Sequence, residues 1–102
     1  IGDLSGLAIA HKAYRISLGG KEAPVLDGLT GDQRFYLAYA QGWRSKTRDE
    51  VTRQRLISNP HSPSPYRVLG VVRNYDGWYE AFPEVSAQDK YYLPKEKRVR
   101  IW

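Results

Sequence analysis

The stretch "TGDQRFYLAYAQGW", residues 30–43, decides the fold predicted for this chain. Thr30 and Gln33 have the spacing of a capping box, in which the two residues satisfy each other's free backbone N–H groups at the start of a helix. Behind this box, apolar and small residues recur every three or four positions, as on one face of a helix. Both patterns predict an amphipathic helix that begins at Thr30. The predicted stripe consists of Phe35, Ala38, Tyr39, Gly42 and Trp43.

A second helix is predicted over residues 3–18. Its apolar positions follow the same spacing and share their face with a histidine. Gly19 and Gly20 follow directly, and glycine is the usual residue just past the end of a helix. The stripe consists of Leu4, Leu7, Ala8, His11 and Leu18.

Two shorter helices are predicted further along the chain. Thr47 and Glu50 form a second capping-box pattern, which predicts a helix over residues 47–58 that ends before Pro60. Asn74 has the position of an N-cap for a last helix that Pro83 closes. The stripe of this last helix consists of Tyr75, Trp78, Tyr79 and Phe82.

The rest of the chain is predicted to be non-helical. "NPHSPSPYR", residues 59–67, holds three prolines, which restrict the backbone and disfavour a helix. "RVLGVV", residues 67–72, is rich in β-branched residues and is expected to be extended, although it is too short to define a sheet. The last stretch, residues 91–102, is expected to be irregular and basic. The fold class is therefore mainly α, with irregular loops and little strand.

Composition restricts the class of protein further. The chain has 102 residues, no cysteine and a net charge of +5. This length suits one domain, so residues 1–102 are expected to form a single unit. The absence of cysteine excludes disulfides and thiolate metal sites, and no apolar run approaches the ~20 residues of a membrane span. The chain lacks an initiator methionine and a signal peptide, so we expect it to be a fragment of a longer protein.

Five segments in this order carry a resemblance to a known family. They are "GDLSGLAIAHKAY" (2–14), "GLTGDQRFYLAYAQGWR" (28–44), "HSPSPYRVLGVVRN" (61–74), "YEAF" (79–82) and "RVRIW" (98–102). The series resembles the C-terminal end of the neprilysin-type zinc metallopeptidases over nearly the whole chain. The resemblance implies the helical C-terminal part of a peptidase catalytic domain that hydrolyses oligopeptides. Because cysteines usual in animal members are missing, the chain looks more like a bacterial member.

The resemblance also implies that the zinc site is incomplete in this chain. The family binds zinc through two histidines of an HExxH helix and a glutamate of a later Glu-x-x-x-Asp motif. No HExxH occurs here, and the glutamate would lie just before Ile1. Asp3 matches the aspartate of that motif, which orients a ligating histidine in the family. The alternative from the residues alone is that Asp3 caps the first helix or complements its dipole.

His61 and Arg67 match two residues of the family that act on the substrate. The histidine donates a hydrogen bond to the oxyanion of the tetrahedral intermediate, and the proline-rich loop would hold it in position for this. The arginine contacts a substrate carbonyl beside the scissile bond, and it could also pair with Asp3. The alternatives are a solvent-exposed loop histidine and an ordinary surface arginine.

Trp43 matches an aromatic residue that lines the pocket for the side chain after the cleaved bond. The alternative is that Trp43 is a core residue of its helix, and both readings can hold together. Gly42 departs from the branched aliphatic residue frequent in the family, which leaves the fine specificity open. His11 matches no functional position.

Two other classes of function remain open from the residues. Basic side chains at Arg44, Lys46, Arg48, Arg53, Arg55 and in "KEKRVR" could bind nucleic acid, although acidic residues are interspersed and no nucleic-acid motif occurs. A non-catalytic interaction scaffold is the third class. On the leading reading the partners are oligopeptides and the upstream half of the same domain, with no nucleic acid and no membrane segment in this piece. The resemblance favours a periplasmic, secreted or cell-surface location, while the residues also leave a cytoplasmic location open, and the chain alone is expected to be inactive.

Overall fold

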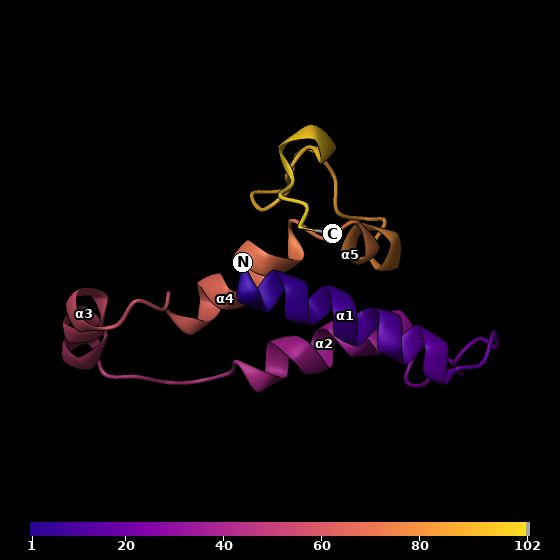
Figure 1. Cartoon of the computed structure of the whole chain (residues 1–102), viewed down its shortest axis with the longest axis horizontal. Coiled ribbons are helices and arrows are strands. Elements are labelled where there is room, and N and C mark those ends of the chain that lie inside the picture. The colour runs from indigo at the N-terminus through magenta and orange to yellow at the C-terminus, as the bar shows by residue number, and fades with distance from the viewer. Residues whose placement is uncertain (102) are drawn as a thin grey trace.

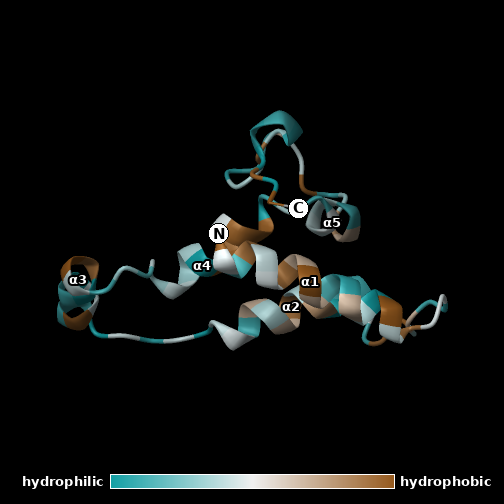
Figure 2. Ribbon diagram, viewed as in Figure 1, coloured by the Kyte–Doolittle hydropathy of each residue, from teal (hydrophilic) through white to brown (hydrophobic). Residues whose placement is uncertain are grey.

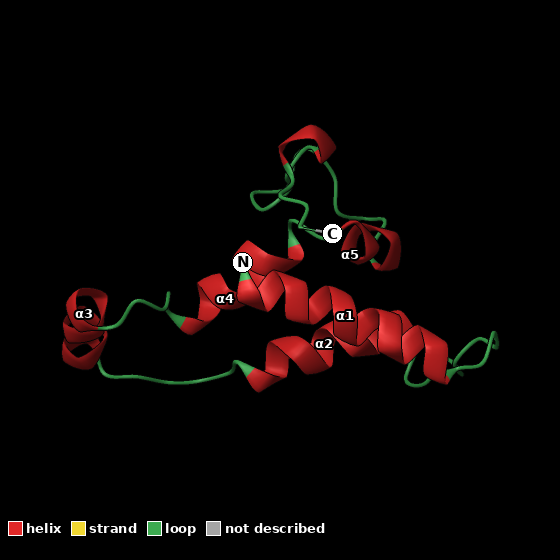
Figure 3. Ribbon diagram, in the orientation of Figure 1, coloured by secondary structure: helices red, strands yellow, loops and turns green. Residues whose placement is uncertain are grey.

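Helices make up the regular structure of the computed structural model, which describes residues 1–101 (Figure 1). Within these residues no strand forms, and extended pairing is limited to an isolated bridge between Leu26 and Leu29 (Figure 3). The mainly α fold class with little strand is therefore confirmed. The helices are α1 (Gly2–Ser17), α2 (Gly31–Gly42), α3 (Asp49–Ser58), α4 (Ser64–Val72), α5 (Asp76–Ala81) and a 3₁₀ helix (Lys95–Lys97).

Helix α1 agrees with the sequence prediction. Leu4, Leu7 and His11 are buried along one face, as the spacing of the stripe predicts. Gly19 and Gly20 follow with φ of 58° and 78°, a backbone conformation that L side chains rarely adopt. Glycine therefore stops the helix because the chain must turn through the left-handed region at this point.

Helix α2 begins with the predicted capping box. The backbone N–H of Gln33 donates to the Thr30 hydroxyl over 3.2 Å, and the backbone N–H of Thr30 donates to the Gln33 side chain over 3.0 Å. The predicted stripe is only partly correct, because Tyr36 is the most deeply buried side chain of the helix, whereas Ala38 is exposed. The apolar face of α2 is thus rotated toward α5, which packs against it.

The small core lies where α1, α2 and α4 meet. Figure 1 shows α1 and α2 side by side, with α4 near the N-terminal end of α1. Aromatic side chains from α2, α5 and the segments flanking α5 pack around this core. Its buried apolar residues are Leu4, Leu7, Tyr36, Val71 and Val72.

The prediction that residues 67–72 are extended was wrong, because this segment lies within α4. The prolines do not prevent the helix: Pro65 is its second residue, where the missing N–H has no intrahelical partner to lose. Val71 and Val72 are buried in the core through this helical turn. Burial of these side chains outweighs the modest preference of β-branched residues for strands.

Two predicted helix caps were also wrong. Helix α3 has Arg48 as its N-cap without a side-chain capping bond, so the Thr47 pattern is not used. Helix α5 has Tyr75 as its N-cap, and Asn74 instead donates to the Gly70 carbonyl and accepts from the backbone N–H of Val99. Asn74 therefore ties the C-terminal segment to the end of α4, a long-range bond that local sequence does not indicate.

Helix α3 stands away from the other helices, joined to them by two extended connections (Figure 1). No residue of α3 is buried, yet part of its ribbon carries the brown of hydrophobic residues (Figure 2). Among them, Leu56 is 64% and Ile57 is 92% exposed. No described helix has both the length and the apolar composition that a membrane crossing requires.

The capping box of α2 provides a test of this fold. Thr30→Ala removes the acceptor for the Gln33 N–H and should cost about 1 kcal/mol, so amides in the first turn of α2 should exchange about fivefold faster. Hydrogen exchange followed by mass spectrometry in the intact parent protein measures this. Thr47→Ala is the matched control and should leave exchange in α3 unchanged, since Thr47 caps nothing. Equal increases in amide exchange for the two substitutions would contradict the assignment of Thr30, and not Thr47, as a helix cap.

Candidate functional site

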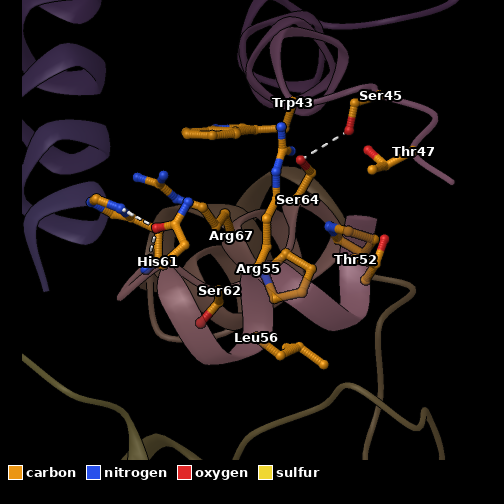
Figure 4. A pocket seen from close by; sticks show the side chains of 13 residues that line it. Trp43, Ser45, Thr47, Thr52, Arg55, Leu56, His61, Ser62, Ser64 and Arg67 are labelled. Carbon is orange, nitrogen blue, oxygen red and sulfur yellow. Dashed lines mark hydrogen bonds between the residues drawn. The ribbon is translucent and has the colours of Figure 1, made fainter. Parts of the chain in front are cut away.

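Three of the four predicted site residues line one cavity, between the end of α2, α3 and the loop that enters α4. The cavity has a volume of about 420 Å³, and its walls include Trp43, His61 and Arg67 (Figure 4). Trp43 is the C-cap of α2, His61 lies in the loop before α4, and Arg67 lies in the first turns of α4. Trp43 is thereby brought to residues 18 and 24 positions further along the sequence.

The fourth residue, Asp3, reaches this site through Arg67. The Arg67 Nε donates to Asp3 Oδ2 and Nη2 donates to Oδ1, each over 2.7 Å. This is a two-bond, fork-shaped pair in which both side chains are mostly covered, with exposed fractions of 22% for Arg67 and 28% for Asp3. The ion pair expected between these residues is confirmed. Asp3 does not cap α1, whose N-cap is Ile1 without a side-chain bond.

The ion pair with Arg67 keeps the Asp3 carboxyl ionised. The hydrogen bond from Arg67 lowers the pKa of the Asp3 carboxyl, partial burial works in the opposite direction, and the charge of Arg67 adds a smaller lowering effect. Asp3 is therefore an anion throughout the neutral range.

Two further contacts fix Arg67. Its guanidinium lies over the ring of Trp43, with 4.0 Å between the guanidinium carbon and the ring centroid (Figure 4). The hydroxyl of Tyr39 donates to the Arg67 backbone carbonyl over 2.9 Å. With Nε and Nη2 engaged by Asp3, Nη1 is the guanidinium nitrogen that has no hydrogen-bond partner among residues 1–101. One donor group is thus left for a ligand.

His61 is exposed and is oriented by a neighbour. The side-chain oxygen of Asn59 accepts from the backbone N–H of His61 over 2.9 Å and lies 3.0 Å from His61 Nδ1. The other ring nitrogen, Nε2, makes no hydrogen bond within the described chain. Asn59 was not among the predicted site residues, although an asparagine that hydrogen-bonds two residues ahead is a common turn signal.

The described residues do not form a metal site. Nowhere within residues 1–101 do three His, Asp or Glu side chains gather closely enough to hold an ion. His11 is buried on α1, with Nδ1 3.0 Å from the Tyr75 hydroxyl and Nε2 3.2 Å from Asp32 Oδ1 without forming a hydrogen bond. His11 is therefore part of the packing between α1, α2 and the start of α5.

Comparison with known sequences identifies relatives of this chain. The sequence model of Peptidase family M13 matches residues 1–99. Endothelin-converting enzyme 1 of Bos taurus is 41% identical over 86 residues, which cover 80% of this chain and 11% of that protein. Mouse membrane metallo-endopeptidase-like 1 is 40% identical over 108 residues, covering all of this chain and 13% of its own length. The chain thus spans about an eighth of these relatives.

Solved structures agree with this result. The cryo-EM structure of Mycobacterium tuberculosis zinc metalloprotease ZMP1 in an open state superimposes with a TM-score of 0.95 at 52% identity, covering all of this chain and 16% of that one. The crystal structure of ZMP1 with an inhibitor gives a TM-score of 0.94 at 51% identity, covering 99% of this chain and 15% of that one. Sequence and structure together place this chain in peptidase family M13, the neprilysin-type metallopeptidases.

Proposed function

We propose that this chain is part of a zinc-dependent metalloendopeptidase that hydrolyses peptide bonds in oligopeptides. The observation that supports this most strongly is the Asp3–Arg67 pair, stacked on Trp43 and sharing a cavity with His61. Each of these residues also matches a family position on sequence grounds. The family implies zinc in the intact enzyme, and since residues 1–101 hold no cluster of metal-binding side chains, we assign the metal and the general base to other parts of the parent protein.

Arg67 is proposed to hold the substrate backbone. The free Nη1–H groups can donate to a peptide carbonyl while Nε and Nη2 stay on Asp3. Because the guanidinium is planar and is fixed by Asp3 and Trp43, the direction of these donors is set before the substrate arrives. A peptide is thereby held in register relative to the rest of the site.

His61 is proposed to stabilise the oxyanion. Attack on a peptide carbonyl gives a tetrahedral intermediate whose oxygen carries negative charge, and a donor already in position lowers the barrier to it. Nε2 is the ring nitrogen that remains available for this, because Nδ1 faces Asn59. The position of His61 in the same cavity as Arg67 allows both residues to contact one substrate.

Asp3 and Trp43 are proposed to have two functions each. A carboxylate has about four acceptor positions, so Asp3 can accept from Arg67 and still orient a ligating histidine supplied by the rest of the protein. Trp43 positions Arg67 with the face of its ring and forms part of the wall that receives the substrate side chain. A periplasmic, secreted or cell-surface location follows from the family resemblance as part of the same proposal, and the family match does not favour a nucleic-acid-binding module.

The role of His61 is tested by His61→Ala in the full-length, zinc-loaded enzyme. Loss of the oxyanion donor should lower kcat about 100-fold, since one such donor contributes about 3 kcal/mol, with little change in KM. Steady-state kinetics on an oligopeptide measures this, and the melting temperature checks the fold. His61 is exposed, so a folded variant is expected. An unchanged kcat would refute the role.

The role of Arg67 is tested by comparing Arg67→Ala with the same substitution at a second arginine of the cavity. Arg67→Ala should weaken binding of a peptide inhibitor by about 10- to 100-fold, because it removes a charged donor of about 1.5–3 kcal/mol. Arg55 lines the same cavity and is the matched control. Arg55→Ala should change the inhibitor Kd less than threefold, as expected for a charge without a directed bond. Equal losses would show that the cavity attracts peptides by charge alone.

A further inference from the structure

The turn that carries His61 determines which of its ring nitrogens bears a proton. Asn59 Oδ1 lies 2.9 Å from the His61 backbone nitrogen and 3.0 Å from Nδ1 of the same residue. A backbone N–H can only donate, so the Asn59 atom that meets it must be the side-chain oxygen and not the amide nitrogen. The backbone contact therefore fixes the orientation of the Asn59 amide.

The orientation of the amide in turn fixes the tautomer of the imidazole. An amide oxygen can only accept, so Nδ1 must carry the hydrogen that it directs at Asn59. A neutral imidazole has a single N–H, which leaves Nε2 as a bare acceptor. Nε2 can donate to an oxyanion only when the ring is protonated on both nitrogens. In its neutral form this histidine would instead repel a negatively charged oxygen.

We propose that Asn59 is a positioning residue that aims Nδ1 of His61 at its own side-chain oxygen, so that Nε2 donates to the oxyanion only in the imidazolium form. This inference rests on the proposed function of His61. It predicts that peptide hydrolysis falls with rising pH as the imidazolium loses its proton. It also predicts that the charge of residue 59 sets the pH at which this fall occurs.

The other charges around His61 do not change this reasoning. Asp3 on α1, Arg55 on α3 and Arg67 on α4 are the charged groups near the ring or in its cavity. Asp3 and Arg67 neutralise one another through their two-bond pair. None of these three groups changes when residue 59 is substituted. A difference in the pH dependence of hydrolysis between variants therefore reports the contact between residues 59 and 61.

The test is the pH dependence of kcat/KM for the full-length enzyme with Asn59→Asp. Aspartate keeps the accepting oxygen and adds a negative charge that favours the imidazolium. The fall of kcat/KM at alkaline pH, the alkaline limb of the profile, should therefore move to a pH about one unit higher. Asn59→Ala removes the orienting bond and should lower kcat about tenfold with little change in KM. Gln54→Glu is the matched control: it adds a negative charge on α3 outside the cavity wall and should leave the limb in place.

The outcomes separate this inference from the proposed function. If His61→Ala leaves kcat unchanged, the proposed function fails. If His61→Ala lowers kcat but Asn59→Asp leaves the alkaline limb where the wild type has it, only the role of Asn59 is overturned. The inference also requires that Asn59→Asp has no effect on the pH profile of a His61→Ala enzyme. A shift in that background would overturn it, because the added charge would then act on another group.

Discussion

The two-bond pair between Asp3 and Arg67 is the interaction on which the site depends. It joins the first turn of α1 to the first turns of α4, which are 64 residues apart in sequence. Buried or half-buried pairs of this kind do not necessarily stabilise a protein, because desolvation offsets much of the attraction. Their geometric effect is direct: Asp3 holds one edge of the guanidinium through two bonds, and Trp43 covers one of its faces.

Packing of the surrounding helices also fixes the position of Arg67. Val71 and Val72 anchor the C-terminal half of α4 in the core, while its N-terminal half carries Arg67 to the cavity. Tyr39 on α2 holds the Arg67 backbone from a second helix. The small core therefore controls the direction in which a surface residue points, and residues far from the cavity contribute to its shape.

Local signals in the sequence predicted α1, α2 and the end of α3 because capping boxes and glycine stops act through neighbouring residues. The helix over residues 64–72 was not predictable in this way, since its formation depends on burial of valines against α1. Asn74 does not cap α5 for a similar reason. Its side-chain oxygen accepts a hydrogen bond from the backbone N–H of Val99, which comes near only when the chain folds. For the site, the family resemblance indicated Asp3, Trp43, His61 and Arg67. The contacts that Asn59 and Tyr39 make with His61 and Arg67 became visible only in the folded structure.

The most direct test of this account is a structure of the full-length enzyme with a phosphinic peptide, which mimics the tetrahedral intermediate. The account predicts that Nη1 of Arg67 donates to a backbone carbonyl of the inhibitor while Nε and Nη2 remain on Asp3. His61 Nε2 should lie within hydrogen-bond distance of a phosphinate oxygen. An Arg67 that leaves Asp3 to reach the inhibitor, or an imidazole turned away from the phosphinate, would contradict it.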